Sequence, residues 1–543
     1  MPNTKVEEIL SLNDYLTSQN DNMRSYWQDL SDFCHPRKAW ITSMRVKGER
    51  VKYNFLYDST AIKSVRTCAA GFHTHLTNPA SRWFAWETSD PKLMRNYDVR
   101  LWFKNTEDKI YSVLNKSNFY NIIHEFYTDF VLFGTACMFV DEDVRDTARF
   151  TSIPINQINI VEDSNERVIG VYRNFKLTAM AAFRLFGANV GEAVLKSLEK
   201  KPYEEFEFLH YVMKRHERDI RKADAINMPY KSCWINKKDR HLITESGYME
   251  MPYIIGRFYK DSSDVMGFGP AMDALPEVKL INAQKKTVIR GAMKQVDPPV
   301  SAPSKGFQLP LNFNPAGVSY RDAKTPHDAI QPIQTGGNAQ LGMEVIQMQK
   351  SDIEEAFFVP LFRTLLEVTK QMTIPEVQQR VAEGMALLGP VVGRATSEVL
   401  GPMLNRVLNI ANRNMLLEPA PEAMYNGEET VDFNPLYLSV LAKAQKESEA
   451  VLIERFMMEI SQIGQFKPEI FDKFDEDEAY NTLSRIRGIN PEINRPDENV
   501  QEIRQARQQQ QMAAMAVEAG QGIAKATKEA ANAGKMISEA NKQ

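Results

Sequence analysis

The first part of the chain carries hydrophobic side chains at the spacing of an α-helix. From residue 6 to about residue 130 apolar positions recur every three or four residues, and the first such run contains Ile9, Leu10, Leu16, Met23, Tyr26, Trp27, Leu30 and Phe33. A second helix is predicted to begin at Ser59 or Thr60, with Asp58 or Ser59 as its N-cap. Two more helices are predicted over residues 98–117 and 119–136.

The pattern changes between about residues 138 and 259, where short runs alternate or are rich in β-branched side chains. Such runs are typical of strands in a half-buried antiparallel sheet. The predicted strands lie within residues 149–163, 168–177, 206–215 and 230–238, and one short helix at 178–186 interrupts them. The sequence therefore predicts one antiparallel sheet after the N-terminal helices.

Two helical segments enclose an irregular one in the middle of the chain. Residues 271–295 and 341–366 have helical periodicity, whereas 296–340 is rich in proline, glycine and asparagine and predicts loops and short strands. A loop is expected at 367–373.

A long helical run is predicted to follow this loop and to reach residue 413. It opens with Thr373, Pro375 and Glu376, which form a capping box with proline in the first turn. Pro390 and Pro402 are expected to kink or divide the run. Residues 431–495 are predicted to be acidic and partly helical.

The C-terminal tail is rich in helix formers and poor in large apolar side chains. As one helix, residues 497–541 would extend about 65 Å at 1.5 Å per residue. The small residues of the tail would let parallel helices from several copies pack closely into a tube; they are Ala513, Ala516, Gly520, Ala524, Ala526, Ala530 and Ala533. The alternative is a frayed tail, because each glycine costs about 1 kcal/mol of helix stability.

Composition excludes several classes of protein. The 543 residues are long enough for two to four domains, and 43% hydrophobic with 25% charged residues is typical of globular protein. The net charge of −4 argues against bulk condensation on nucleic acid but allows local basic stripes. The four cysteines have no paired spacing, which favours a reducing compartment, and no apolar run approaches the ~20 residues of a membrane span.

The search for catalytic or metal-binding motifs finds no complete one. His73 and His75 stand two residues apart, so on a helix they point to different faces, and structural histidines are the preferred interpretation over a metal site. The glycines of residues 267–271 match no phosphate-binding pattern and favour a tight turn into a helix. The carboxylates of residues 471–480 favour a solvated helix face over a two-metal nuclease centre. We therefore expect no enzymatic activity, no cofactor and no metal.

One pattern of basic residues has two interpretations that a single copy of the chain does not decide between. Lys279, Lys286, Arg290 and Lys294 are spaced by seven, four and four residues and therefore share one face of the predicted 271–295 helix. The face is either a solvated outer surface or a stripe that meets a polyanion.

Three segments, taken in order, resemble one family. Residues 58–87 ("DSTAIKSVRTCAAGFHTHLTNPASRWFAWE"), 245–282 ("ESGYMEMPYIIGRFYKDSSDVMGFGPAMDALPEVKLIN") and 371–410 ("QMTIPEVQQRVAEGMALLGPVVGRATSEVLGPMLNRVLNI") look like the head-to-tail connector, or portal, family of short-tailed double-stranded DNA bacteriophages. The third segment, with its Leu-Gly-Pro-x-x-Gly-Arg run, is the most similar. The resemblance covers roughly residues 20–420.

The resemblance implies an α+β, mainly helical portal fold that assembles as a ring, usually of twelve copies, around a DNA channel. It divides the chain into a wing (1–267, with the sheet at 138–260), a first stem helix (268–295), a clip (296–340), a second stem helix (341–366), a channel loop (367–373), a wing-crossing helix (374–430), a crown (431–496) and a C-terminal helical barrel (497–543).

In such a ring the basic stripe would become belts of positive charge. The residues expected to contact DNA without sequence preference are Lys279, Lys286, Arg290, Lys294 and, in the channel loop, Lys370. The implied function is DNA packaging and ejection at one capsid vertex, after assembly in the cytoplasm of a bacterial host.

The implied partners are the packaging terminase, a tail adaptor protein and the major capsid or scaffolding protein, with no membrane. A tail-side adaptor ring remains the alternative, although an adaptor would lack the 271–366 excursion. A metal-dependent nuclease using residues 471–480 is the less favoured third interpretation.

Overall fold

A computed structural model gives the fold of the chain, which divides into two compact units. The first consists of Met1–Phe84, Lys109–Leu417 and Tyr437–Ala444, and the second of Ala85–Asp108, Glu418–Leu436 and Gln445–Gln543. The residues described are 2–42, 55–90, 92–222, 224–296, 300–301, 331–332, 339–366, 388–426, 429–438, 440–464, 469, 474–487, 499–512, 528, 530 and 532. Helices with two antiparallel sheets make the fold α+β, as predicted.

The N-terminal helices have the positions that periodicity predicts. They are α1 (Pro2–Cys34), α2 (Thr60–Leu76), α3 (Tyr97–Lys116) and α4 (Phe119–Phe133). Ser59 occupies the N-cap position of α2 but its side chain makes no cap hydrogen bond, whereas Asp58 Oδ1 accepts from the Thr60 amide at 2.7 Å. Short 3₁₀ turns lie at Pro36–Lys38, Leu93–Arg95, Ile155–Gln157, Gly187–Val190 and Ala225–Asn227.

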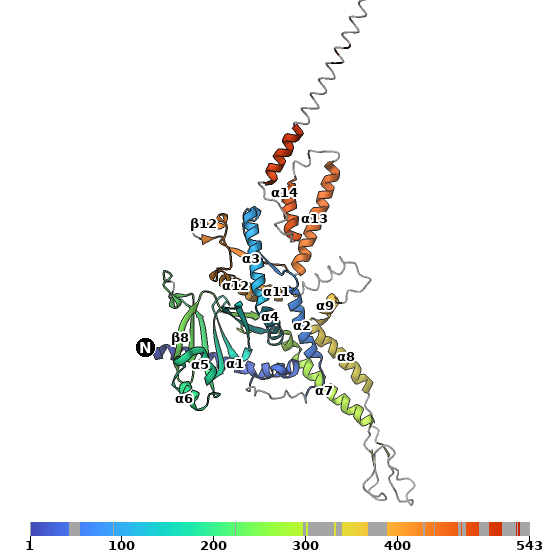
Figure 1. Cartoon of the computed structure of the whole chain (residues 1–543). Helices are drawn as coiled ribbons and strands as arrows, with labels where there is room; N and C mark the ends of the chain where they lie inside the picture. The colour runs from blue at the N-terminus through green and yellow to red at the C-terminus, as the bar shows by residue number, and fades with distance from the viewer. Residues whose placement is uncertain are drawn as a thin grey trace, which may run out of the picture. The chain divides into compact units, whose positions relative to one another are not determined.

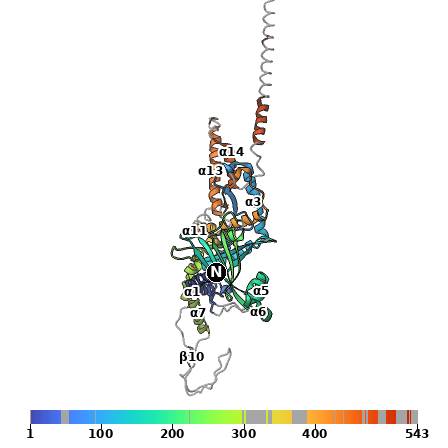
Figure 2. The same ribbon diagram turned by 90° about the vertical axis from the view of Figure 1, so that its left-hand side faces the viewer.

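Five strands form the larger sheet, in the order β4-β5-β6-β7-β8, all antiparallel. They are β4 (Ile158–Glu162), β5 (Val168–Thr178), β6 (Glu205–Lys214), β7 (Tyr230–Asn236) and β8 (His241–Tyr248). Side chains alternate along β6: Leu209 packs with Val6 of α1, whereas Phe206 and Phe208 pack with the helices after β5. The N-terminal part of α1 thus covers one face of this sheet (Figure 2).

The predicted single sheet is wrong, because a second, three-stranded sheet is present. Its order is β3-β2-β9, with β2 (Thr135–Asp143), β3 (Thr147–Ile153) and β9 (Tyr253–Arg257). Pro154, which lacks an amide hydrogen, ends β3, and a 3₁₀ turn separates it from β4. The chain then changes sheet, and β9 returns to pair with β2.

Two helices, not one, interrupt the strands. α5 (Ala179–Phe186) begins where it was predicted, with the Thr178 side chain accepting from the Ala181 amide. α6 (Glu192–Lys200) was not predicted, since Val194 is its single fully buried residue. Both cover the face of the larger sheet opposite to α1.

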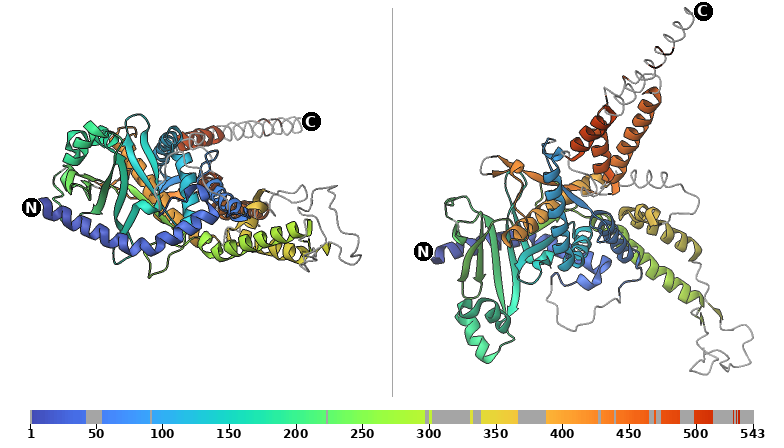
Figure 3. Two further views of the ribbon diagram at one scale, coloured as in Figure 1. Left: turned by 90° about the horizontal axis from the view of Figure 1, so that it is seen from below. Right: turned by 45° about the horizontal axis from the view of Figure 1, so that its top comes forward.

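A pair of long helices leads away from the sheets of the first unit (Figure 1, Figure 3). α7 (Pro270–Val296) matches the predicted helix 271–295, and α8 (Ala339–Ala356) returns beside it. Between them β10 (Val300–Ser301) pairs antiparallel with β11 (Gln331–Pro332). Of the expected clip 296–340, the end residues 296, 339 and 340 belong to α7 and α8, and 297–299, 302–330 and 333–338 lie outside the described residues.

The predicted continuous helix 341–366 is wrong, because the chain breaks at Phe357–Phe358. α9 (Val359–Leu366) starts after Phe358, whose φ of 56° is left-handed and ends α8. Pro360 sits in the first turn of α9, where proline is tolerated. The Arg363 guanidinium then bridges back to Glu354 of α8 through two bonds of 3.0 and 3.3 Å.

Prolines divide the next helical run, as predicted. α11 (Gly389–Arg394) has Pro390 in its first turn and α12 (Gly401–Arg413) has Pro402, with the π-helical turn η6 (Ala395–Leu400) between them. The helix ends at Arg413, so the expected extension to residue 430 is wrong. The expected loop 367–373 and the cap that follows it lie outside the described residues.

The second unit combines short strands with acidic helices. It contains most of β1 (Phe84–Thr88) and of β14 (Phe433–Tyr437), which pair with each other, and α13 (Val440–Gly464) from Gln445 onward. It also contains the 3₁₀ turn Glu422–Met424, the hairpin β12 (Tyr425–Asn426)–β13 (Glu429–Thr430) and α14 (Glu476–Arg487). The rings of Trp86, Trp102 and Phe103 pack around Phe433 at 5.5 to 5.6 Å between centroids.

Residues 85–108 belong to this second unit, although the resemblance assigned them to the wing. Of the expected C-terminal barrel, residues 499–512 are helical, and the remainder is outside the described residues except at 528, 530 and 532. Within the part of the chain that is described, no helix combines the length and the apolar character needed to cross a bilayer.

Candidate nucleic-acid interface

The base of α7 is fixed to the first unit by polar and apolar contacts. Asn282 is buried, and its Oδ1 accepts from the backbone amides of Tyr57 and Asp58 at 2.9 and 3.1 Å. Tyr26 of α1 donates to the Met272 carbonyl at 3.0 Å. The apolar side of this half of the helix is buried: Ala271, Ala274, Leu275, Val278 and Ile281. The helix is therefore rigidly held at its first half.

The first two members of the basic stripe contact their own chain. Lys279 Nζ lies 2.6 Å from Asp29 Oδ2 and 5.6 Å from the ring centre of Phe33, both on α1. Lys286 lies over the ring of Tyr57 at 5.6 Å. Lys279 nevertheless keeps 42% of its side-chain area exposed.

The outer two members of the stripe are exposed. Arg290 and Lys294 have no ion-pair partner among the described residues, and they lie in the half of α7 that extends beyond Asn282. Because i, i+4 residues share a helix face, the two charges stand on one side about 6 Å apart along the axis. The predicted stripe therefore has an inner half that contacts its own chain and an outer half that forms no ion pair with a described residue. Lys370 lies outside the described residues.

The helices α7 and α8 pack closely but leave apolar side chains uncovered. A Cβ at Gly342 of α8 would lie 2.8 Å from Val288 Cγ2 of α7, so glycine permits this approach. Ile346 and Ile353 of α8 are buried. The exposed apolar side chains of the pair, which the sequence did not single out, are Leu280, Met293, Val296, Met343, Val345 and Met348.

The described carboxylates of the acidic run 471–480 include one that caps a helix and one that forms an ion pair. Asp475 Oδ1 accepts from the Glu478 amide at 3.0 Å at the start of α14. Asp477 binds Arg504 through two bonds of 2.6 and 2.7 Å, and this lowers the pKa of its carboxyl. No cluster of three or more metal-ligating side chains occurs among the described residues. These contacts favour the structural interpretation of the run.

The two histidines of α2 face different sides, as predicted. His73 packs edge-to-face on His124 at 5.7 Å between ring centres, and His75 stacks on Phe362 of α9 at 6.0 Å. Burial lowers the pKa of both imidazoles. They are packing residues between helices.

The glycine-rich turn into α7 is tight, as predicted, because two backbones meet there. Gly134 ends α4 with a φ of 68°, and a Cβ on it would lie 2.5 Å from the Gly269 amide nitrogen. The Gly267 amide donates to Thr135 Oγ1 at 2.7 Å. The turn therefore joins α7 to the three-stranded sheet, and the Gly267 amide is used for that contact.

Buried arginines join the sheets to the later helices, which sequence patterning did not reveal. Arg257 of β9, 3% exposed, binds Glu162 of β4 and Glu398 of η6. Arg406 of α12 donates through Nε to the Val140 carbonyl at 2.8 Å and through Nη1 to Glu250. A lone arginine has no periodic signal, and its partners lie 95 to 266 residues away.

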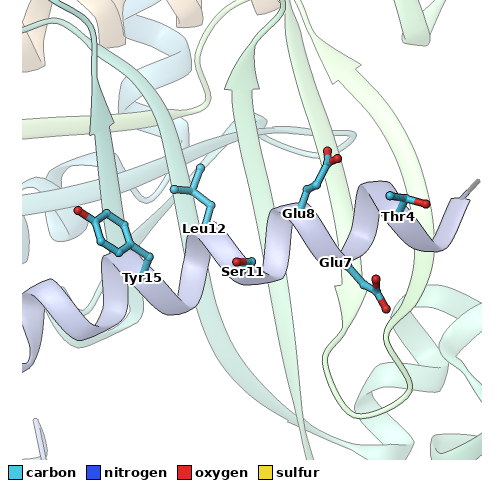
Figure 4. Close-up of a pocket in the computed structure, with 6 residues that line it drawn as sticks. All are labelled: Thr4, Glu7, Glu8, Ser11, Leu12 and Tyr15. Atoms are coloured by element: carbon cyan, nitrogen blue, oxygen red, sulfur yellow. The ribbon is translucent and has the colours of Figure 1, made fainter.

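A shallow pocket along α1 offers no convergent chemistry. Its six lining side chains come from one side of the same helix (Figure 4), namely Thr4, Glu7, Glu8, Ser11, Leu12 and Tyr15. Glu7 is paired with Arg240 at 3.6 Å. The basic outer half of α7 remains the better candidate for a functional surface.

The chain is similar to known phage proteins over nearly its whole length. The family model described as "Bacteriophage head to tail connecting protein" matches residues 6–494. The "Portal protein" of Salmonella phage epsilon15 is 31% identical over 537 residues, which cover 97% of this chain and 96% of that protein. The "Probable portal protein" of Bordetella phage BPP-1 is 30% identical over 521 residues, which cover 94% of this chain and 92% of that protein. This chain belongs to the bacteriophage head-to-tail connecting protein family.

Proposed function

We propose that this chain assembles into a ring at one vertex of a phage capsid and that double-stranded DNA passes through the channel of the ring. The observation that supports the proposal most strongly is the α7–α8 pair. It extends from the first unit with six exposed large apolar side chains, which neighbouring copies in a ring would cover. In this assembly α7 and α8 form the stem, residues 296–340 the clip, 367–373 the channel loop, and 431–496 the crown.

The outer half of the basic stripe would form two belts of positive charge in the ring. Arg290 and Lys294 are exposed and would meet phosphates, whereas Lys279 is partly neutralised by Asp29. Contacts to phosphate carry no sequence information, so DNA of any sequence can slide past. Lys370 of the expected channel loop would add a further belt.

The partners of such a ring follow from its place between head and tail. During loading it would dock the packaging terminase, which supplies ATP hydrolysis. A tail adaptor would replace the terminase afterwards. The capsid or scaffolding protein would contact its outer rim. Completed particles would carry the ring at the head–tail junction, after assembly in the bacterial cytoplasm.

Native mass spectrometry tests the ring directly. About twelve copies of the 62.0 kDa chain give roughly 740 kDa. A chain that stays monomeric at every concentration and ionic strength would refute the proposal.

DNA binding by the assembled ring tests the basic belts. The double variant Arg290→Ala/Lys294→Ala is expected to weaken binding of linear duplex and to lower the slope of log K against log salt. Lys196→Ala, which removes one exposed charge on α6, is the matched control and leaves the slope unchanged. An equal slope in both variants would exclude the stripe as the contact.

A further inference from the structure

The helix α13 exposes more apolar surface than a helix packed on one side requires. Ala450 and Ile460, with 2% and 6% exposure, mark its buried side. The exposed large side chains are Val451 at 56%, Leu452 at 63%, Phe456 at 54%, Met458 at 66% and Ile463 at 47%. An ordinary surface helix has one apolar stripe and a polar remainder. Phe456 contacts the Phe474 ring at 5.9 Å between centroids and is still half exposed, so α13 has apolar surface that the described residues of the second unit leave uncovered.

Helical periodicity divides these five side chains into two separate flanks. Leu452, Phe456 and Ile463 follow one another at i, i+4 and i+11 and share the first flank. Val451 and Met458 are seven residues apart and share the second. A polar ridge runs between the flanks, opposite to the buried side, and consists of Arg455, Glu459 and Gln462.

We propose that each flank of α13 is covered by α13 of a neighbouring copy, the first flank of one chain packing on the second flank of the next. A two-fold dimer needs a single self-complementary patch, whereas a closed head-to-tail ring needs two different patches on opposite flanks. α13 carries two different apolar patches, as a head-to-tail ring requires. The inference rests on the proposed ring and assigns one of its contacts to this helix.

The exposed area fits a contact that helps to close a ring but does not hold it alone. The five side chains, each about half exposed, present roughly 500 Å² in total, the size of a functional apolar patch. A standard interface buries about 1,600 Å² counted over both partners. Since every interface uses one flank from each copy, α13 supplies about a third of that area, and other parts of the chain supply the rest.

Thiol crosslinking tests which surfaces meet. The four native cysteines are buried, so introduced cysteines are the accessible ones. In the assembled full-length protein, the variant Phe456→Cys/Met458→Cys carries one thiol on each flank at nearly the same height. A short bismaleimide is expected to give a ladder of covalent dimers, trimers and larger species. Arg455→Cys/Glu459→Cys on the polar ridge is the matched control and gives no ladder.

Single-cysteine variants distinguish the head-to-tail contact from other arrangements. Phe456→Cys alone and Met458→Cys alone are each expected to stay uncrosslinked, because like flanks do not meet. A covalent dimer from either single variant indicates a two-fold contact and overturns the inference. Equal crosslinking of the ridge control overturns it as well.

Native mass separates this inference from the proposed function. A ring that forms with no ladder overturns the α13 contact and leaves the proposed ring intact, with another protein or another part of the chain covering the flanks. A monomer overturns both. If the first pair of substitutions prevents folding, Val451→Cys/Leu452→Cys samples the same two flanks about one to two turns earlier on the helix, with the same expected ladder.

Discussion

Replacing Gly71 by alanine is expected to destabilise the protein when Phe362 is present and to stabilise α2 when Phe362 is replaced by alanine. Gly71 lies inside α2, and a Cβ there would lie 2.5 Å from Cε1 of the Phe362 ring on α9. Phe362 is 3% exposed, and its ring also contacts Phe72 and His75 at 6.0 Å between centres. The contact fixes α9, the helix that precedes the expected channel loop.

The expected magnitudes follow from two opposing effects. Alanine is favoured over glycine inside a helix by about 1 kcal/mol. Overpacking a filled contact costs about 1–3 kcal/mol. Gly71→Ala should therefore destabilise the pair by up to about 2 kcal/mol. In the Phe362→Ala background the ring is absent, so the helix preference alone remains and Gly71→Ala should stabilise α2 by about 1 kcal/mol.

Amide hydrogen exchange of α2 and α9, read by mass spectrometry, measures both effects. A loss of 1–2 kcal/mol corresponds to about 5- to 30-fold faster exchange. Gly291→Ala in α7 is the matched control, because no atom lies within 4 Å of its Cβ position, and it should slow exchange of α7 in both backgrounds. Slower α2 exchange for Gly71→Ala with Phe362 still present would refute the packing argument.

Three further predictions concern single side chains. Burial, together with the positive charge of Lys38, lowers the pKa of His35 to about 4, so the folded state favours the neutral imidazole. Folding stability should therefore fall as the pH drops from about 6.5 to about 4. The urea midpoint of the His35→Asn variant should fall less over that range. Thr178→Ala removes the cap of α5 and should cost about 1 kcal/mol, visible as faster exchange in α5 and not in α7. Glu398→Gln removes the charge that Arg257 meets and should lower the urea midpoint, whereas an unchanged midpoint would mean that Glu162 alone balances Arg257.

Local patterns predicted most of the elements but not their pairing. The periodicity of residues 271–295 is a property of neighbouring residues, and α7 spans Pro270–Val296 as a result. The partition into two sheets depends on β9 pairing with β2, more than 110 residues earlier, and no local pattern carries that information. The break of α8 at Phe358 was missed because an aromatic residue is a poor marker for a left-handed φ, although Pro360 was a signal in the sequence.

The sequence predicted that the basic residues of the candidate site share one helix face, but it did not predict which groups they contact. The spacing of Lys279, Lys286, Arg290 and Lys294 predicts a shared face, which needs the helix alone. Which charges are free depends on the partners. Asp29 lies 250 residues from Lys279 in the chain and reaches it because α1 packs against α7. The difference between the inner half of the stripe, which contacts α1 and Tyr57, and the exposed outer half therefore required the fold.

Exposed apolar side chains occur on helices of both compact units, on α8 in the first and on α13 in the second. Each unit, considered by itself, therefore has surface that a single copy leaves in water. If neighbours in a ring cover both surfaces, the C-terminal tail is not needed to hold the ring together. A chain that ends at Pro496 should then still form a ring with the same number of copies, as its native mass would show. A ring that dissociates on this truncation would instead make the tail the main contact and would reduce α8 and α13 to secondary ones.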